Sequence, residues 1–471
     1  MKTLNVLGMD YGASGGRGMI GRFDGNRLGL EEVHKFPNNP VQVLGGTYWN
    51  VLMLFEELKN TLRKAKALRM PVSSVGIDTW ASDYGLLDSQ GNLLGNPHHY
   101  RDIRTDTILE EANRVFTQRD VFYRTGMEPH HRHTLYQLLS MRRDEKDMLE
   151  KADTLLFVPN LLAYFLTGNK SCDATQGSAA LLYDPVQKAW IREFLDGYGL
   201  PDILPGIGEH GEVIGNILDS VCAETGMDPC PVILTPSHDT ASAISAVPGK
   251  EKTEVIYISS GTWSIIGSTI ERPLIHEGVL KYGFNNEIGY KDEIMFVKNV
   301  TGLWVLQECL RQWSNEGEET DLAYFDEYAR SADYGGFFDI EKETFMEPGD
   351  MVNKIRKNCA DAGQKAPESK GDIYVSIINS LAKKYGEVIG LAEELTSIKY
   401  KRIHIVGGGA KDGALCRRTA KVTGLEVCAG PYEATAIGNI VAQLAALGEI
   451  RSADEARMLI ETSFPVTTYE P

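Results

Sequence analysis

Two distant segments of this 471-residue chain share one pattern, in which an apolar run, a turn of small residues and a second apolar run follow one another. They are LNVLGMDYGASGGRGMIGRF at residues 4–23 and EVIYISSGTWSIIGS at residues 254–268. Such runs, separated by glycine-rich turns, predict paired strands. Helical periodicity follows each pair, over residues 50–66 and 372–395. The chain is therefore expected to be α/β, with two duplicated domains (residues 1–248 and 249–471) and an interdomain cleft.

The composition excludes several classes of partner. A net charge of −17 argues against nucleic acid or an anionic membrane surface, because both require a basic face. No run approaches the ~18 apolar residues of a membrane span, and Asp10 interrupts the N-terminal apolar stretch, unlike a signal peptide. The seven scattered cysteines include no C-x-x-C pair and predict reduced, mostly buried thiols. The sequence thus predicts a cytoplasmic protein and leaves its oligomeric state open.

Three turns of small residues each follow an apolar run, at residues 10–17, 259–262 and 407–409. Glycines let backbone N–H groups converge on phosphate oxygens, and Ser14 and Thr262 add hydroxyl donors. Asp10 is a candidate Mg²⁺ ligand, because Mg²⁺ prefers carboxylates, waters and substrate phosphates. A single turn of this kind is more often an ordinary turn, so the prediction of a phosphate site depends on all three.

Two other nucleotide motifs do not explain this pattern. The P-loop signature G-x-x-x-x-G-K-[ST] is absent from the sequence. Residues 206–211 (GIGEHG) match G-x-G-x-x-G, but PDILP precedes them where a strand is needed, and EVIGNI follows where a helix should begin. The match is therefore not a dinucleotide site.

Asp239 stands in PSHDTASA, where an apolar run ends and small residues begin. A carboxylate there is either a general base or the N-cap of the helix expected after it, and the pattern alone favours neither. Ser237, His238 and Asp239 do not form a hydrolytic triad, because three consecutive residues cannot align nucleophile, base and orienting group.

Taken in order, the motifs resemble those of the FGGY carbohydrate kinases of the actin-like ATPase (ribonuclease H-like) superfold, and SSGTWS, NVTGLW and AGPYEATAIGN are typical of the rhamnulokinases within this family. The resemblance covers nearly the whole chain. Its other segments are VLGMDYGASGGRG, GIDTWASDYGLLD, YRDIRT, TLYQL, GEVIGNI, SHDTASA, FMEPGDM and IHIVGGGAKDG.

This resemblance implies ATP-dependent phosphorylation of a ketose at a primary hydroxyl, with Asp239 as the general base, ATP and Mg²⁺ as cofactors, and L-rhamnulose as the first-choice substrate. The N-terminal domain would bind sugar and carry the first phosphate turn, and the C-terminal domain would bind nucleotide. The residues that match ATP contacts are Ala13, Ser14, Gly15, Gly16, Arg17, Thr262, Gln307 and Gly408. Those that match sugar contacts are Ala81, His238, Asp239, Thr240 and Asn299, and Asp10 matches the metal position. Several of these residues also have a simpler interpretation. Residues 13–17 and Thr262 could belong to ordinary turns, Gln307 could be a polar residue on a helix face, and Asn299 could be a helix cap.

The sugar side departs from the family pattern. Ala81 stands where a glycine is usual, and residues 130–133 (HHRH) replace mainly apolar residues. With His98 and His99 they form a histidine-rich set, for which hydrogen bonding to sugar or surface exposure is favoured over metal binding. The alternatives to L-rhamnulose are another ketose or deoxyketose, such as L-fuculose or a xylulose-type sugar, or a non-catalytic sugar sensor.

Overall fold

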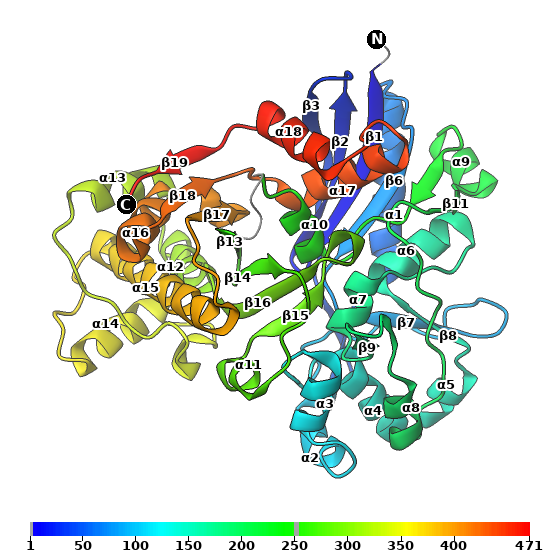
Figure 1. Cartoon of the computed structure of the whole chain (residues 1–471), viewed down its shortest axis with the longest axis horizontal. Helices are drawn as coiled ribbons and strands as arrows, with labels where there is room; N and C mark the ends of the chain where they lie inside the picture. Colours follow the sequence, from blue (N-terminus) through cyan, green and yellow to red (C-terminus); the bar gives the residue numbers. More distant parts are fainter. Residues whose placement is uncertain (1–2, 249–253) are drawn as a thin grey trace. The chain divides into compact units, whose positions relative to one another are not determined.

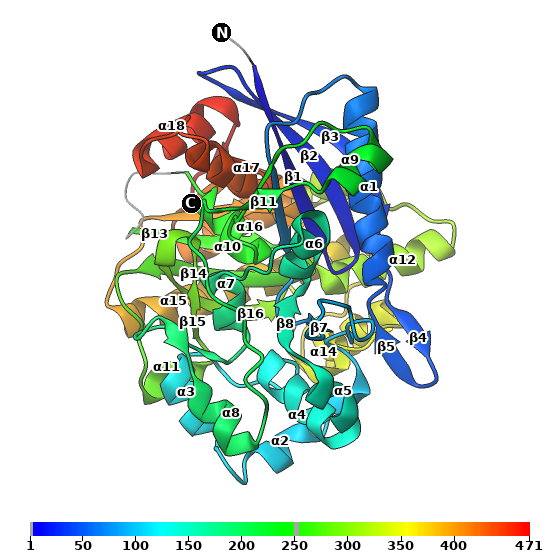
Figure 2. The same ribbon diagram turned by 90° about the vertical axis from the view of Figure 1, so that its right-hand side faces the viewer.

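A computed structural model describes residues 3–248 and 254–471 (Figures 1 and 2). The chain divides into two compact units. The first comprises Met1–Pro248, Ile270–Phe296 and Thr435–Ser463, and the second Gly249–Thr269, Val297–Ala434 and Phe464–Pro471. Two segments from the second half of the sequence thus belong to the first unit. The predicted domain boundary adjoins residues 249–253, which lie outside the described residues.

A six-stranded sheet forms the centre of the first unit, with the strand order β11-β12-β6-β1-β2-β3. Strands β1, β2 and β3 are antiparallel neighbours, whereas β6 runs parallel to both β1 and β12. The strands are β1 (Leu4–Gly12), β2 (Gly15–Phe23), β3 (Leu28–Pro37), β6 (Val75–Thr79), β11 (Val213–Asn216) and β12 (Pro231–Ile233). Shorter strands of the unit are β4 (Val41–Val43), β5 (Gly46–Tyr48), β7 (Tyr84–Leu87), β8 (Thr154–Phe157), β9 (Tyr183–Asp184), β10 (Ala189–Trp190) and β15 (Asn285–Ile288).

Helix α1 (Val51–Ala67) begins where the sequence predicts, because the Asn50 side chain accepts a hydrogen bond from the Met53 backbone N–H. Its apolar face is fully buried against the sheet through Leu54, Leu58 and Leu62. The other helices are α2 (Ile108–Ala112), α3 (Gln118–Thr125), α4 (Thr134–Asp144), α5 (Lys146–Lys151), α6 (Val158–Thr167), α7 (Ala174–Ala179), α8 (Arg192–Tyr198), α9 (Asp219–Thr225), α10 (Asp239–Ser245), α11 (Glu277–Tyr282), α17 (Ala434–Ala446) and α18 (Ala453–Ser463).

Helices α1 and α17 cover opposite faces of this sheet (Figures 1 and 2). Glycines in β2 allow both to approach closely. A Cβ atom on Gly18 would lie 2.2 Å from Thr61 of α1, and one on Gly21 would lie 2.4 Å from Ile440 of α17. Because residues 18 and 21 face opposite sides of the strand, the two glycines of β2 admit one helix on each face of the sheet.

A side chain at Gly438 of α17 is expected to disturb packing measurably. A Cβ atom there would lie 1.9 Å from the Ser242 carbonyl oxygen of α10. Gly438→Ala is therefore expected to destabilise the protein by about 1–3 kcal/mol, despite the better helix propensity of alanine. The matched control is Gly390→Ala, since a Cβ at Gly390 meets no atom within 4 Å and should stabilise its helix. Urea unfolding midpoints should move in opposite directions, and a common shift would contradict the packing argument.

The sheet of the second unit repeats the arrangement of the first, which confirms the predicted duplicated α/β fold. Strands β13 and β14 are antiparallel, and β13, β17 and β18 are parallel, as are β1, β6 and β12. The strands of this sheet that belong wholly or partly to the second unit follow the order β16-β14-β13-β17-β18-β19. The strands are β13 (Val255–Ser260), β14 (Trp263–Ile270), β16 (Ile294–Thr301), β17 (Arg402–Val406), β18 (Glu426–Ala429) and β19 (Thr467–Tyr469).

The longest helix of the second unit, α15 (Lys370–Thr396), matches the predicted helix at residues 372–395 within two residues at its start and one at its end. A capping box between Ser369 and Asp372 fixes where it begins. It packs beside α16 (Gly413–Thr423). The remaining helices are α12 (Trp304–Asn315), α13 (Leu322–Ser331) and α14 (Met351–Asp361).

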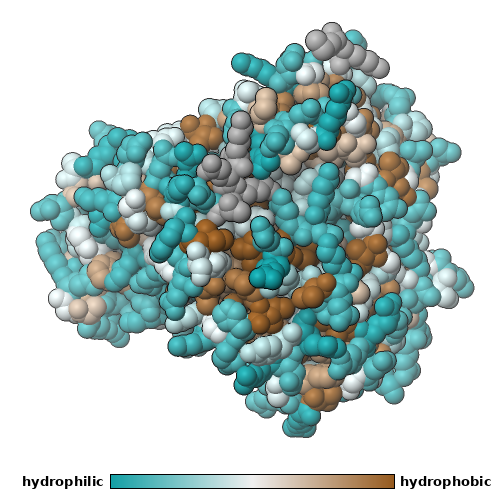
Figure 3. All heavy atoms as spheres, viewed as in Figure 1, coloured by the Kyte–Doolittle hydropathy of each residue, from teal (hydrophilic) through white to brown (hydrophobic). Residues whose placement is uncertain are grey.

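The exposed side chains and the state of the cysteines are those of an ordinary globular protein, as the composition suggests. Hydrophilic side chains cover most of the face seen in Figure 3. All seven cysteines are buried free thiols, as predicted. Within the described part of the chain, no helix combines the length and apolarity needed to cross a membrane.

Candidate active site

Acidic residues gather where the parallel strands of the first unit end. Asp10 of β1 is in register with Asp78 of β6, and Asp239 follows β12. The Thr79 backbone N–H donates to the Ser237 carbonyl oxygen at 2.9 Å, which ties the end of β6 to the segment before Asp239. Ligands of α/β proteins bind at the carboxyl ends of parallel strands, so this edge is the candidate site.

Asp78 was not singled out by sequence reasoning. It is fully buried and accepts a 2.6 Å hydrogen bond from the Asn439 amide of α17. Burial, followed by the charge of Asp10, raises its pKa well above the usual value. The charge of Asp10 thus disfavours joint ionisation of the two carboxyl groups, unless a cation compensates.

Asp239 is the first residue of α10, and its predecessor His238 is the N-cap. One carboxylate oxygen accepts from the Thr240 backbone N–H at 2.6 Å and from the Thr240 hydroxyl at 3.2 Å. About a third of the side chain is exposed (32%), yet the surrounding protein raises its pKa to about 6 by desolvation. The group is therefore accessible and poised to exchange a proton near neutral pH.

The His238 imidazole lies between two carboxyl groups. Its Nε2 is 3.4 Å from Asp239 Oδ1, and its Nδ1 is 3.5 Å from Glu287 Oε2 of β15. Glu287 is only 4% exposed. The sequence does not single out Glu287, because the FNNEIGY segment carries no catalytic motif and the polar residues of β15 (NNEI) do not indicate a buried strand.

A buried network holds the segment before Asp239 in place. The carboxylate of Asp173, fully buried at the start of α7, accepts hydrogen bonds from the hydroxyls of Ser237 and Thr175. His210 Nε2 lies 3.3 Å from the same carboxylate, and the Thr175 hydroxyl in turn accepts from the His238 backbone N–H at 3.0 Å. Burial raises the pKa of Asp173. Its contacts with His210, Ser237 and Thr175 lower the pKa by more than burial raises it, so the net shift is downward. An ionised Asp173 carboxylate with these hydrogen-bond partners therefore holds the segment before Asp239.

The first glycine-rich turn is narrower than its sequence suggests. Gly12 pairs with Gly15, so only Ala13 and Ser14 form the turn, while Gly15, Gly16 and Arg17 belong to β2. Arg17 Nη2 lies 3.4 Å from Asp10 Oδ2 across the strand pair. The buried Asn38 fixes the turn by donating to the Gly12 carbonyl oxygen at 3.0 Å.

Ala81, half-buried, lies just after β6 at the same edge of the sheet. Two residues on, the buried Asp83 accepts from the indole N–H groups of Trp49 and Trp80 at 2.6 and 3.0 Å. The Gln137 amide donates to its other oxygen at 2.8 Å. Desolvation raises the pKa of Asp83 to about 6 despite these bonds. The sugar-side segment is therefore anchored through one carboxylate.

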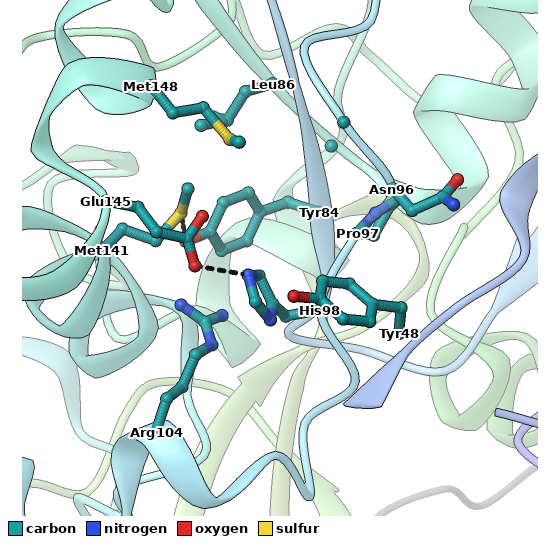
Figure 4. Close-up of a pocket in the computed structure, with 12 residues that line it drawn as sticks. Tyr48, Tyr84, Leu86, Asn96, Pro97, His98, Arg104, Met141, Glu145 and Met148 are labelled. Atoms are coloured by element: carbon teal, nitrogen blue, oxygen red, sulfur yellow. Dashed lines mark hydrogen bonds and ion pairs between the residues drawn. The ribbon is translucent and has the colours of Figure 1, made fainter. Parts of the chain in front are cut away.

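The histidine-rich set does not form one site. His130 and His131 rings are 4.2 Å apart in the loop before α4. His98 instead pairs with Glu145 at 2.7 Å, in a cavity of about 130 Å³ that Tyr48, Tyr84 and Arg104 also line (Figure 4). Among the described residues, no group of three or more His, Cys, Asp or Glu side chains is arranged to hold a metal ion.

The residues predicted to contact nucleotide in the second unit lie on two neighbouring loops and a helix. The Thr262 hydroxyl, between β13 and β14, donates to the Gln307 side-chain oxygen of α12 at 3.1 Å. Gly407 has a left-handed φ of 79°, and a Cβ there would lie 2.9 Å from the Ser260 carbonyl oxygen. The adjacent Gly408 is exposed. Only glycine permits this approach of the turn to the end of β13.

Asn299 belongs to a different unit from the other predicted sugar contacts. It is exposed on β16, in the part of the strand that belongs to the second unit, whereas Ala81, His238, Asp239 and Thr240 belong to the first. Its predicted role stays a prediction.

The chain matches two family models that together span most of its length. Residues 6–245 match the N-terminal domain of the FGGY family of carbohydrate kinases, and residues 256–447 match its C-terminal domain. The rhamnulokinase of Halalkalibacterium halodurans is 35% identical over 98% of both chains. The rhamnulokinase of Bacteroides thetaiotaomicron is 34% identical over 99% of this chain and 96% of that protein.

Solved structures share the fold at low sequence identity. A xylulose kinase from Lactobacillus acidophilus superposes with a TM-score of 0.79 at 17% identity, covering 99% of this chain and 94% of that one. The glycerol kinase of Plasmodium falciparum, solved with ADP, gives 0.77 at 15% identity, with coverage of 99% and 94%. The domain matches, the curated relatives and the shared fold agree: the chain belongs to the FGGY family of carbohydrate kinases.

Proposed function

We propose that this carbohydrate kinase transfers the γ-phosphoryl group of ATP to the 1-hydroxyl of L-rhamnulose. The observation that carries the proposal is the similarity to rhamnulokinases at 34–35% identity over nearly the whole chain. The carboxylate of Asp239, accessible and with a pKa raised to about 6, supports the chemistry.

In the proposed reaction, Asp239 accepts the proton of the sugar hydroxyl as the hydroxyl oxygen bonds to the γ-phosphorus. The bond to the bridging oxygen breaks, and ADP leaves. His238 and Thr240 flank the base and are proposed to contact the sugar, together with Ala81 and Asn299. The methyl group of Ala81 reduces the space beside the sugar, which makes this position a candidate for substrate selection.

The proposed nucleotide contacts are the Ala13–Arg17 turn, Thr262, Gln307 and Gly408. Asp10 fits a Mg²⁺ ligand, because its carboxylate stands at the end of β1 beside a second, buried carboxyl group. When bound, Mg²⁺ would neutralise charge on the ATP phosphates. Arg17 keeps the Asp10 carboxylate oriented from the opposite strand.

The substrate is tested by coupled ADP release with Mg-ATP and a panel of ketoses that includes L-rhamnulose, L-fuculose and xylulose. Turnover that requires L-rhamnulose is the expected result. Turnover with another ketose would contradict the substrate and retain the enzyme class. Sugar binding without turnover would instead indicate a sensor, and sugar-independent hydrolysis an ATPase. We further propose a cytoplasmic location, where ATP and reduced thiols are available, to be checked by fractionation.

A further inference from the structure

Two buried polar atoms face each other beside the proposed base. Within residues 3–248 and 254–471, neither His238 Nδ1 nor Glu287 Oε2 has a hydrogen-bond partner, and the two atoms are 3.5 Å apart. Both side chains are at least nine-tenths buried, with 10% and 5% exposed. A buried carboxyl oxygen without a partner is costly, so this contact requires a proton between the two atoms.

The position of that proton decides whether His238 directs an N–H or a lone pair at Asp239. A neutral imidazole carries one N–H and one lone pair. If a protonated Glu287 donates to Nδ1, the N–H is at Nε2 and points toward Asp239 Oδ1, 3.4 Å away. If Nδ1 instead donates to an ionised Glu287, the Nε2 lone pair faces the Asp239 carboxylate and repels it. Catalytic hydrogen bonds of this length commonly tighten when substrate binds.

We propose that Glu287 is a positioning residue that fixes the tautomer of His238, so that the imidazole donates its Nε2–H to the carboxylate of Asp239. Glu287 holds the proton on the side of Nδ1 and thereby keeps Asp239 ionised and oriented for the sugar hydroxyl. The expected effect of Glu287 on turnover rests on the proposed function, whereas the tautomer of His238 does not.

The surrounding charges support this arrangement. Burial raises the pKa of Glu287 and lowers that of His238, and both shifts favour a proton on the carboxyl group and a neutral imidazole. The charged groups facing His238 are Glu287 from β15, Asp239 from α10 and Asp173 from the start of α7. The bonds of Asp173 to Ser237, Thr175 and His210 leave Glu287 as the acid at Nδ1.

The first experiment reads the tautomer without substrate. The protein is labelled with ¹⁵N in the histidine rings, and the His238 signals are assigned by their absence in His238→Asn. We expect the Nε2–H form in the wild type, a mixture of tautomers in Glu287→Leu, and the Nε2–H form restored in Glu287→Gln, whose amide N–H can donate to Nδ1. An Nδ1–H form in the wild type, or an unchanged tautomer in a folded Glu287→Leu, would overturn the proposal.

The second experiment measures turnover with the sugar that proves active. Glu287→Leu should lower kcat about 10- to 100-fold, as removal of an orienting partner commonly does, with the sugar KM within about twofold. The acidic limb of its pH profile should move to higher pH, because Asp239 loses a fixed donor. The control is Glu277→Leu, at a 63% exposed side chain of the same unit, which should leave both constants unchanged. A raised KM with normal kcat would overturn the proposal in favour of direct sugar binding.

The two measurements separate the inference from the proposed function. If the wild type turned over no sugar in the panel, the kinase assignment would fail, while the tautomer of His238 would still be decided by the NMR measurement. If turnover were normal and the tautomer did not depend on Glu287, the positioning role alone would fail.

Discussion

Replacing Asp239 with asparagine is expected to lower kcat by about 10²- to 10⁴-fold, the usual contribution of a general base. The amide keeps the shape of the side chain and an oxygen that can accept from the Thr240 N–H, so the fold and sugar binding should persist. The amide cannot take the proton of the hydroxyl at neutral pH. Single-turnover kinetics with saturating ATP would isolate the chemical step.

The chain offers a matched control for this substitution. Asp219 is also the first residue of a seven-residue helix, α9, and it is exposed. Asp219→Asn should therefore lose any helix-terminus contribution of the charge and leave kcat unchanged. Near-normal turnover in Asp239→Asn would refute the base assignment and favour a structural role for Asp239.

The same assignment predicts the pH dependence of the wild-type enzyme. Since Asp239 must be ionised to accept a proton, and its pKa is raised to about 6, kcat/KM should increase with pH through about 6 and level off above it. This acidic limb is measured with the active sugar at constant ionic strength. A rate that stays flat down to pH 4 would mean that no group with the raised pKa of Asp239 limits the reaction.

Removing the carboxylate of Asp173 is expected to be the most destabilising single change among the site residues. Asp173→Ala would leave His210 Nε2 and the hydroxyls of Ser237 and Thr175 buried without their partner. Loss of one member of a buried, bonded charge cluster costs about 3–5 kcal/mol. Urea unfolding should show this loss, together with reduced kcat, because Ser237 directly precedes the His238–Asp239 pair.

The control for Asp173→Ala is Asp202→Ala, which removes a carboxylate that is 50% exposed and paired with Arg192, and should change stability by less than about 1 kcal/mol. The folded-state pKa of Asp173 is lowered, so its contribution is present above the unfolded pKa of about 4 and lost as the pH falls through the lower folded value. The difference between wild type and Asp173→Ala should shrink accordingly in acid. A difference that persists at low pH would point to packing instead of charge.

The sequence determined the elements that depend on local patterns. The two strand–turn–strand segments, the start of α1 and the extent of α15 follow from periodicity and capping residues such as Asn50 and Ser369. The order of the family motifs also suffices to identify the kinase family. For Asp239, the sequence placed a carboxylate at a strand end but did not distinguish a base from a cap.

Only the tertiary structure brought together the partners of that carboxylate. Asp173, His210 and Glu287 come from segments far apart in the sequence and meet around residues 237–239. Helix α17 reads as an apolar helix, yet its Asn439 bonds the buried Asp78 of β6. Periodicity reports which face of an element is buried, whereas the partner of a buried polar group depends on which segment the fold places opposite it. The sequence therefore decided the strands, the long helices and the family, and the fold decided which acids act together, because hydrogen-bond partners are chosen by distance in space.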